Sequence, residues 1–242
     1  RNNYGVPLWM GESGENSNHW YYEVFKLLEE NNIGWNFWTH KKVDKITSPY
    51  SALVTPQYQV IIDYLRGVGG QPDPNIAGMG LTSFANSLKI ENCITRPGVI
   101  ASLTDPEYGE ISKPYTTHSI PGTIPAAYYD IGARGLSYSD GDYWNDGDGG
   151  YNDGWVFRND GVDVEGSDDD PNIPYTVGWT EAGEWLGYTI EDVLPGTYDV
   201  SFSISAPNAG GIFYAQLSGQ NLGVIDVPST GGWYSWEDIP SQ

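Results

Sequence analysis

The chain has 242 residues, with 32 acidic side chains against 11 Lys and Arg and a formal net charge of −21. That charge argues against a nucleic-acid or anionic-membrane partner, because phosphate groups select for Lys and Arg. Apolar residues make up 39% of the chain and aromatic residues 14%, too much for a disordered acidic tail. No run approaches the ~18 apolar residues of a membrane span. The single cysteine, Cys93, cannot form an internal disulfide.

Charge is unevenly spread along the chain. Residues 1–104 carry 8 basic and 9 acidic side chains, and residues 105–242 carry 3 and 23. We interpret this asymmetry as two domains, 1–104 and 121–242, joined by a linker rich in proline at 105–120. The chain opens without Met and without a targeting segment, so we expect the amino terminus to be a cut edge.

The first part is predicted to alternate strands and helices. Residues 6–11 are a short apolar run, typical of a buried strand. Apolar residues then recur at spacings of three and four over 20–31, which predicts a helix capped by Ser17 or Asn18. Gly34 is expected to close that helix as a left-handed residue.

A second strand is predicted over 34–40, followed by helices at 56–66 and 81–89. Alternation along this strand puts its residues on two opposite faces. One face holds Trp35, Phe37 and Thr39, and the other holds Asn36, Trp38 and His40. Strand–helix–strand order implies parallel strands with helical crossovers.

Glu12 stands directly after the first predicted strand, at its carboxyl end. A carboxylate there can act as nucleophile or acid/base in glycoside cleavage. The alternative, a solvated loop carboxylate, stays open on spacing alone, and Glu15 lies close by in the same loop. An aromatic ring such as Trp38 at a strand end is a natural platform for the apolar C–H face of a sugar.

Residues 6–15 (VPLWMGESGE) and 34–38 (GWNFW) resemble the carboxyl-terminal end of glycoside hydrolase family 5, the (β/α)₈ barrels of cellulases and mannanases. The resemblance implies that Glu12 is the catalytic nucleophile and that Trp38 stacks on the sugar being cleaved. His40 would line the same mouth. The family's acid/base Glu belongs to an Asn-Glu pair with no counterpart here, so we expect this chain alone to be inactive.

The second part is predicted to be all-β. Short β-type runs are separated by turn signals, and residues 197–204 alternate polar and apolar side chains as in a half-buried antiparallel strand. Short strands at this spacing favour a β-sandwich.

Three runs, 157–165 (FRNDGVDVE), 177–186 (VGWTEAGEWL) and 230–233 (TGGW), resemble carbohydrate-binding module family 6, a jelly-roll sandwich. The resemblance implies that Phe157 and Trp233 sandwich a sugar in a loop cleft. The family continues for one or two further strands, so we expect a carboxyl-terminal truncation.

Four further aromatic residues need an assignment. Trp155 and Tyr151 either extend the sugar cleft or cover it, and both alternatives stay open. Trp179 and Trp185 are expected to pack in the core, as tryptophans in strands usually do.

An acidic segment raises the question of a structural calcium. Its oxygen-bearing residues are Asp140, Asp142, Asn145, Asp146 and Asp148, with Asp168, Asp169 and Asp170 further on. The spacing does not fit an EF-hand, and the family's calcium ligands are replaced by residues 126–128 (AAY). No cofactor is required, no metal ligand is assigned, and calcium and a solvated acidic loop both stay open.

The sequence therefore predicts a multidomain chain, in which the carboxyl-terminal fragment of a (β/α)₈ TIM barrel precedes an all-β jelly-roll sandwich. Its expected function is as part of a secreted retaining β-glycosidase of the cellulase type, monomeric, acting on β-linked polysaccharide such as glucan or xylan. The alternative is a non-catalytic carbohydrate-binding protein that relies on aromatic stacking alone.

Overall fold

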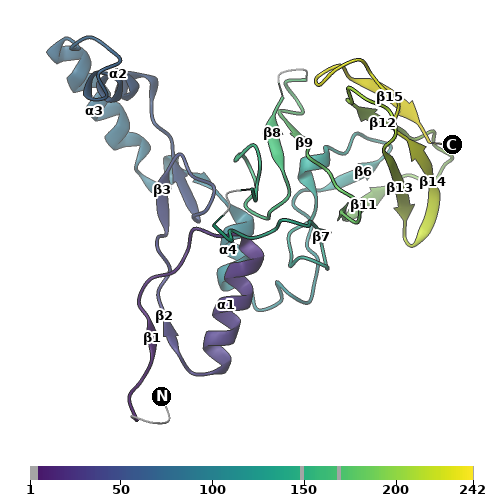
Figure 1. The fold of residues 1–242 in the computed structure, drawn as a ribbon, viewed down its shortest axis with the longest axis horizontal. Helices are drawn as coiled ribbons and strands as arrows, with labels where there is room; N and C mark the ends of the chain where they lie inside the picture. Colours follow the sequence, from purple (N-terminus) through teal and green to yellow (C-terminus); the bar gives the residue numbers. More distant parts are fainter. Residues whose placement is uncertain (1–4, 148–149, 168–169, 242) are drawn as a thin grey trace. The chain divides into compact units, whose positions relative to one another are not determined.

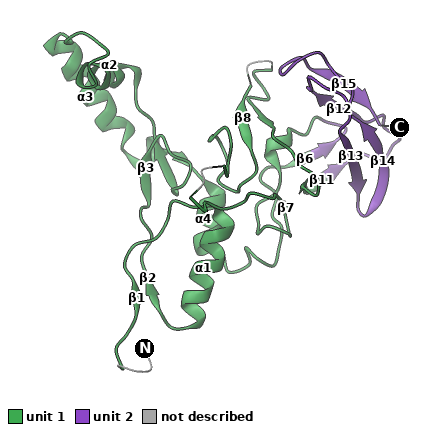
Figure 2. Ribbon diagram, in the orientation of Figure 1, with its two compact units in different colours: residues 1–118, 123–191 green, residues 119–122, 192–242 purple. Residues whose placement is uncertain are grey.

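The computed structural model describes residues 5–147, 150–167 and 170–241 (Figure 1). The chain divides into two compact units, coloured separately in Figure 2. Unit 1 comprises residues 1–118 and 123–191, and unit 2 comprises residues 119–122 and 192–242. Among the described residues, no helix reaches the length and apolarity that a bilayer crossing requires.

The first helix of unit 1, α1 (Asn18–Glu30), begins where the sequence predicted. Ser17 is its N-cap, and the Ser17 hydroxyl accepts a hydrogen bond from the Trp20 backbone N–H at 3.3 Å. The left-handed residue after the helix is Asn32, with φ 50°. The expectation for Gly34 is therefore wrong, because Gly34 already begins the next strand.

The later helices of unit 1 agree with the sequence in part. Helix α2 (Pro56–Leu65) is confirmed, with Pro56 in its first turn and Thr55 as N-cap. Helix α3 runs over Pro74–Ser87, earlier than the predicted 81–89. After α3 the chain forms only a short 3₁₀ turn, η1 (Ile90–Asn92). A fourth helix, α4 (Pro97–Thr104), was not predicted from the sequence.

The strands of the first part form two small sheets. Strands β1 (Trp9–Met10) and β2 (Gly34–Trp35) pair in parallel around α1, which confirms the predicted strand–helix–strand order. The second sheet has the order β3-β4-β5; its strands are Lys41–Val43, Tyr50–Ala52 and Ile94–Thr95. No sheet of the described residues closes into a barrel, and the barrel origin of this part stays a prediction.

A cluster of rings packs α1 against the strand that follows it. Phe25 stacks on Trp35 with ring centroids 4.1 Å apart, and Tyr21 meets Phe37 edge-on at 5.1 Å. Trp35 and Phe37 are half-buried while Trp38 is exposed. The alternation predicted for 34–40 is thus confirmed in its burial, although only the first two residues are paired as strand.

The β-rich part of unit 1 consists of short strands and the 3₁₀ turn η2 (Ala126–Tyr128). Its strand pairs are β7 (Tyr138–Ser139) with β10 (Trp185–Leu186), and β8 (Val164–Gly166) with β9 (Tyr175–Val177). The paired strands β6 (His118–Ile120) and β11 (Ile190–Val193) carry the boundary between the units.

One predicted strand of this part is wrong. Residues 155–158 are irregular, because Trp155 and Phe157 adopt the left-handed region with φ 52° and 66°. A strand requires extended backbone at every residue. The turn brings Arg158 and the residues after it into the interior of unit 1.

Unit 2 is built from two antiparallel pairs. Strand β13 (Ile212–Leu217) pairs with β14 (Gln220–Asp226), and β12 (Ser201–Ile204) pairs with β15 (Glu237–Pro240). The alternation predicted for 197–204 is confirmed over β12, where serines are exposed and Phe202 and Ile204 are half-buried. The predicted linker, 105–120, falls largely within unit 1, and the domain assignment stays a prediction.

Candidate functional site

The loop that carries Glu12 is tied to the segment that carries Trp38. Ser13 accepts a hydrogen bond from the Trp38 backbone N–H at 2.6 Å through its carbonyl, and the Ser13 hydroxyl donates to the Asn36 carbonyl at 2.7 Å. Gly14, with φ 129°, lies so close to the Trp38 carbonyl that a Cβ would overlap it. Only glycine fits that approach. Gly14 therefore helps to hold the loop of Glu12 against the segment of Trp38.

The carboxylates of this loop differ in their surroundings. Glu15 is paired with the Lys42 ammonium at 2.6 Å, and that hydrogen bond holds the pKa of Glu15 below its usual range. Glu12 is exposed, as are Trp38 and His40. Lys42 therefore neutralises the neighbouring carboxylate, while Glu12 faces solvent. The roles of Glu12, Trp38 and His40 stay predictions.

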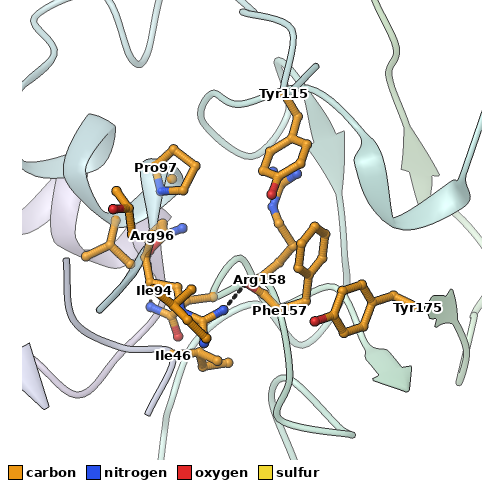
Figure 3. Close-up of a pocket in the computed structure, with 13 residues that line it drawn as sticks. Ile46, Ile94, Arg96, Pro97, Tyr115, Phe157, Arg158 and Tyr175 are labelled. Atoms are coloured by element: carbon orange, nitrogen blue, oxygen red, sulfur yellow. Dashed lines mark hydrogen bonds between the residues drawn. The ribbon is translucent and has the colours of Figure 1, made fainter. Parts of the chain in front are cut away.

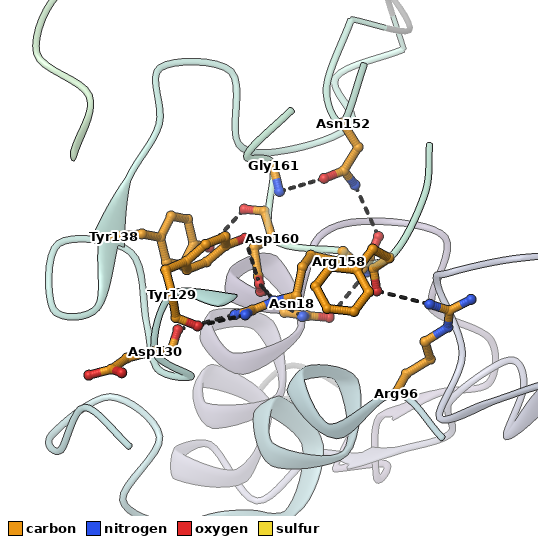
Figure 4. Close-up of polar contacts among 11 residues, drawn as sticks. Asn18, Arg96, Tyr129, Asp130, Tyr138, Asn152, Arg158, Asp160 and Gly161 are labelled. Carbon is orange, nitrogen blue, oxygen red and sulfur yellow. Dashed lines mark hydrogen bonds and ion pairs between the residues drawn. The ribbon is translucent and has the colours of Figure 1, made fainter. Parts of the chain in front are cut away.

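A buried polar network centred on Asp160 lies at the start of α1 (Figure 4). Asp160 is 2% exposed and pairs with the Arg158 guanidinium at 2.9 Å. Its carboxylate also accepts hydrogen bonds from the Asn18 side chain at 2.6 Å and from the Tyr129 hydroxyl at 3.0 Å. Burial by itself would lower the pKa of Arg158, but Tyr129 and Asp160 raise it above its usual range.

The network joins segments that are far apart in the sequence. The Asn159 amide donates to the Asn16 carbonyl at 2.7 Å, and the Asn18 backbone N–H donates to the Asn159 carbonyl at 2.8 Å. The Asn152 side chain accepts from the Gly161 N–H at 2.7 Å. These contacts lock the 158–161 turn against the helix start, which positions Phe157 directly before it.

Phe157 has other rings on several sides. Its ring stacks on Tyr175 at 4.3 Å and 17°, and it contacts Tyr115 and Tyr128 at 5.3 Å each. It is half-buried and packs against the hydrophobic cluster around Tyr129 and Tyr138. The face toward Tyr175 is therefore covered.

The two aromatic residues left open by the sequence behave differently. Tyr151 is 2% exposed and meets Trp155 edge-on at 5.4 Å, so it supports the loop from inside and offers no face to a ligand. Trp155 is 43% exposed, with the Lys45 ammonium 5.8 Å from the ring centroid. Of the two, only Trp155 keeps the surface position that sugar stacking needs.

Trp233 is 71% exposed in unit 2, on a loop that hydrogen bonds fix in place. The Ser205 hydroxyl donates to the Gly232 carbonyl at 3.0 Å, and the Thr230 N–H donates to the Ala206 carbonyl at 2.8 Å. An exposed indole on a fixed loop offers a flat face at little entropic cost. Phe157, the other ring of the predicted sandwich, belongs to unit 1.

Two tryptophans that were expected in the core lie at the surface. Trp179 is 51% exposed and Trp185 is 42% exposed. The expectation is wrong because β10, which carries Trp185, is only two residues long and pairs with β7 alone. Surface position makes both rings further candidates for sugar contact.

The acidic residues do not assemble into a metal cage in the described part of the chain, where no group of three potential ligands was found. Asp148, Asp168 and Asp169 lie outside the described residues. Burial and carboxylate neighbours raise the pKa of Asp163 to about 7, and burial and Glu184 raise that of Asp140 to about 6. Asn145 is engaged with Asn16, whose side chain accepts the Asn145 N–H at 2.8 Å.

Comparison with known proteins supports the carbohydrate-binding interpretation. Residues 158–241 match the family model described as carbohydrate binding module (family 35). The matched family is 35, where the sequence motifs indicated family 6. The alpha subunit of clotting factor G from Tachypleus tridentatus is 37% identical over 60 residues, which cover 24% of this chain and 9% of that protein. The chain thus matches less than a tenth of that relative.

Proposed function

We propose that the chain binds β-linked polysaccharide through Trp233, and that it belongs to a secreted retaining β-glycosidase whose nucleophile is Glu12. The binding half of the proposal has the stronger support, because the carbohydrate-binding module match covers residues 158–241. The observation that carries it is the 71% exposed indole of Trp233 within that match, on a loop whose backbone is held by hydrogen bonds.

A neutral polysaccharide offers no charge, so its affinity must come from buried C–H faces and hydrogen bonds. An indole has only two side-chain torsions and, on a loop held by hydrogen bonds, loses little freedom when a sugar ring stacks on it. Trp155, Trp179 and Trp185 are candidates for additional contacts, since each exposes at least two fifths of its surface.

Retention on insoluble β-glucan and on xylan tests the binding proposal. We expect Trp233→Ala to weaken retention about tenfold, which corresponds to roughly 1.4 kcal/mol. Trp9→Ala is the matched control, because Trp9 is also 71% exposed but lies outside the matched residues. Equal retention of the Trp233 variant and the wild type would remove this ring from the binding surface.

The catalytic half of the proposal relies on the resemblance around Glu12 and on the ties between its loop and Trp38. Retaining hydrolysis needs two carboxyl groups about 5–5.5 Å apart, and the acid/base Glu would come from another strand of the parent barrel. The parallel pair β1–β2 supports this, because parallel strands are normally covered on both faces. Here Val6, Leu8 and Trp9 are 45–71% exposed.

Covalent labelling of the parent enzyme with a fluorinated glycoside tests the catalytic role. We expect the label on Glu12, and we expect Glu12→Gln to abolish it. Glu15→Gln is the control, because Glu15 shares the loop but is paired with Lys42. A label on any other residue would reject Glu12 as nucleophile, and no label on any residue would favour the alternative, a carbohydrate-binding protein without catalysis.

A further inference from the structure

A cavity of about 120 Å³ lies within unit 1, next to Phe157 (Figure 3). One wall comes from residues 94–99, where β5 passes into α4, together with Ile46. The opposite wall is formed by the rings of Tyr115, Phe157 and Tyr175. The cavity therefore lies between segments of the chain that are some 60 residues apart.

Arg96 brings a positive charge into this cavity. One end of its guanidinium donates a hydrogen bond to the Phe157 carbonyl at 2.9 Å. Its Nε is buried and has no hydrogen-bond partner, and no ion pair of Arg96 occurs among the described residues. Burial lowers the pKa of Arg96, which is the expected response of a cation that has lost water without gaining a carboxylate.

Arg158, which also lines the cavity, is occupied by the protein itself. It pairs with Asp160 and donates to the Tyr129 carbonyl at 2.7 Å and to the Asp130 carbonyl at 3.1 Å. The two arginines thus have different roles. Arg158 stabilises the 158–161 turn, whereas Arg96 has a positive charge and an Nε–H donor that no group of the described residues pairs with.

An uncompensated cation beside apolar walls favours an anion, because the Coulomb attraction is stronger where water is excluded. The planar guanidinium fork matches the oxygens of carboxylate and sulfate groups in particular. The aromatic rings of the opposite wall suit the carbon skeleton that carries such a group.

We propose that this cavity binds a small oxyanion, a carboxylate or a sulfate, with Arg96 as its donor. The proposal concerns residues of unit 1 and does not depend on Trp233 or on Glu12. A chain with a net charge of −21 repels anions at long range, so the site selects a ligand by close contact.

Calorimetric titration of the full chain tests the proposal, with acetate, sulfate, glucuronate and glucose as separate probes. We expect at least one oxyanion to bind at least tenfold tighter than glucose. Tighter binding of glucuronate than of acetate would assign the oxyanion to a sugar, and equal binding would assign it to a free anion. If no oxyanion binds more tightly than glucose, the proposal is overturned.

Variants assign the binding to Arg96. We expect Arg96→Met to lose at least tenfold in oxyanion affinity, and Arg96→Lys, which keeps the charge but not the fork, to lose less. Arg66→Met is the control, because Arg66 is an exposed arginine at the end of α2. Trp233→Ala should leave oxyanion binding unchanged, which separates this proposal from the polysaccharide proposal. Unchanged affinity in a folded Arg96→Met or Arg96→Lys variant would overturn it.

Discussion

Around Asp160 the interior of unit 1 is polar, whereas the interior of unit 2 is held by apolar side chains and strand pairing. In unit 1 the buried Arg158–Asp160 ion pair, three asparagines and two tyrosine hydroxyls are joined by hydrogen bonds. In unit 2, Ile225 is the one apolar side chain of the described residues that is almost fully buried, and Phe202 meets Phe213 edge-on at 5.0 Å nearby. Loss of one hydrogen-bond partner in a polar interior leaves another buried group unsatisfied, so it costs much stability. Truncation of a side chain in a small apolar interior costs stability in proportion to the buried area that is lost.

The largest effect should come from breaking the polar interior at its centre. Asp160→Asn leaves the buried Arg158 guanidinium without a counter-charge, so we expect the free energy of unfolding to fall by about 3–5 kcal/mol. Urea unfolding followed by tryptophan fluorescence measures it. The control is Asp105→Asn, because Asp105 pairs with Lys113 at a partly exposed site, and the loss of that pair should cost about 0–1 kcal/mol. Equal losses in both variants would contradict the comparison.

A smaller and more local effect should follow from Ile225→Ala in unit 2. Ile225 is 1% exposed on β14, and we expect a cost of about 2–3 kcal/mol from lost burial and the remaining cavity. Amide hydrogen exchange should speed up in β13 and β14 and stay unchanged in α1. Val224→Ala, at the next and more exposed position of the same strand, is the control. Faster exchange in α1 would mean that the two interiors do not behave independently.

The pH dependence of stability tests the acidic side of unit 1. Burial and the carboxylates of Asp140 and Asp153 raise the pKa of Asp163 to about 7 from an ordinary value of 3.8. The folded state therefore holds a proton that the unfolded state has lost, and stability should fall as pH rises from about 4 to about 7.

Asp163→Asn should remove the larger part of this fall and leave the part due to Asp140, whose pKa is raised to about 6. At pH 8 the variant should be more stable than the wild type, by an amount that solvent screening keeps modest. The two proteins should be equally stable at pH 3. Chemical unfolding at each pH gives the comparison. Asp226→Asn, an exposed change in unit 2, should leave the profile unchanged. A wild-type stability that rises between pH 4 and pH 7 would reject the assignment.

The smallest effect on stability is expected for Trp233→Ala. An exposed ring outside any buried network should change the free energy of unfolding by less than about 0.5 kcal/mol. Thermal unfolding would show this, and it makes any lost polysaccharide retention attributable to the ring itself. A large loss of stability would instead show that Trp233 packs within its unit.

Local signals in the sequence predicted the helices near Trp20 and Pro56 because caps and apolar spacing lie within the segments themselves. The alternation around Trp35 and Phe37 was predictable for the same reason. The exposure of Trp179 and Trp185 was not, because it depends on which strands pair across them. The left-handed backbone at Phe157 could not be predicted either, because that conformation is normally adopted by glycine and is rare for phenylalanine.

The candidate sites divide in the same way. Glu12 and Trp38 were found together through motifs, and their loops are hydrogen-bonded to each other. The Asp160 network was missed because Asn18 and Asp160 are 142 residues apart. Arg96 is not part of any motif. That its Nε has no hydrogen-bond partner among the described residues depends on which distant segments form the walls of the cavity, and the sequence does not show this.

The hydrogen bonds between Asn16, Asn18 and the 159–160 turn also bear on how this protein can be cut and recombined. A designer who grafts residues 121–242, which include the carbohydrate-binding module match, onto an enzyme and severs the chain within 105–120 leaves α1 behind. Asn159 and Asp160 would then face water or an unrelated surface instead of their own helix. A portable version of the module would have to bring α1 along or replace those two polar residues.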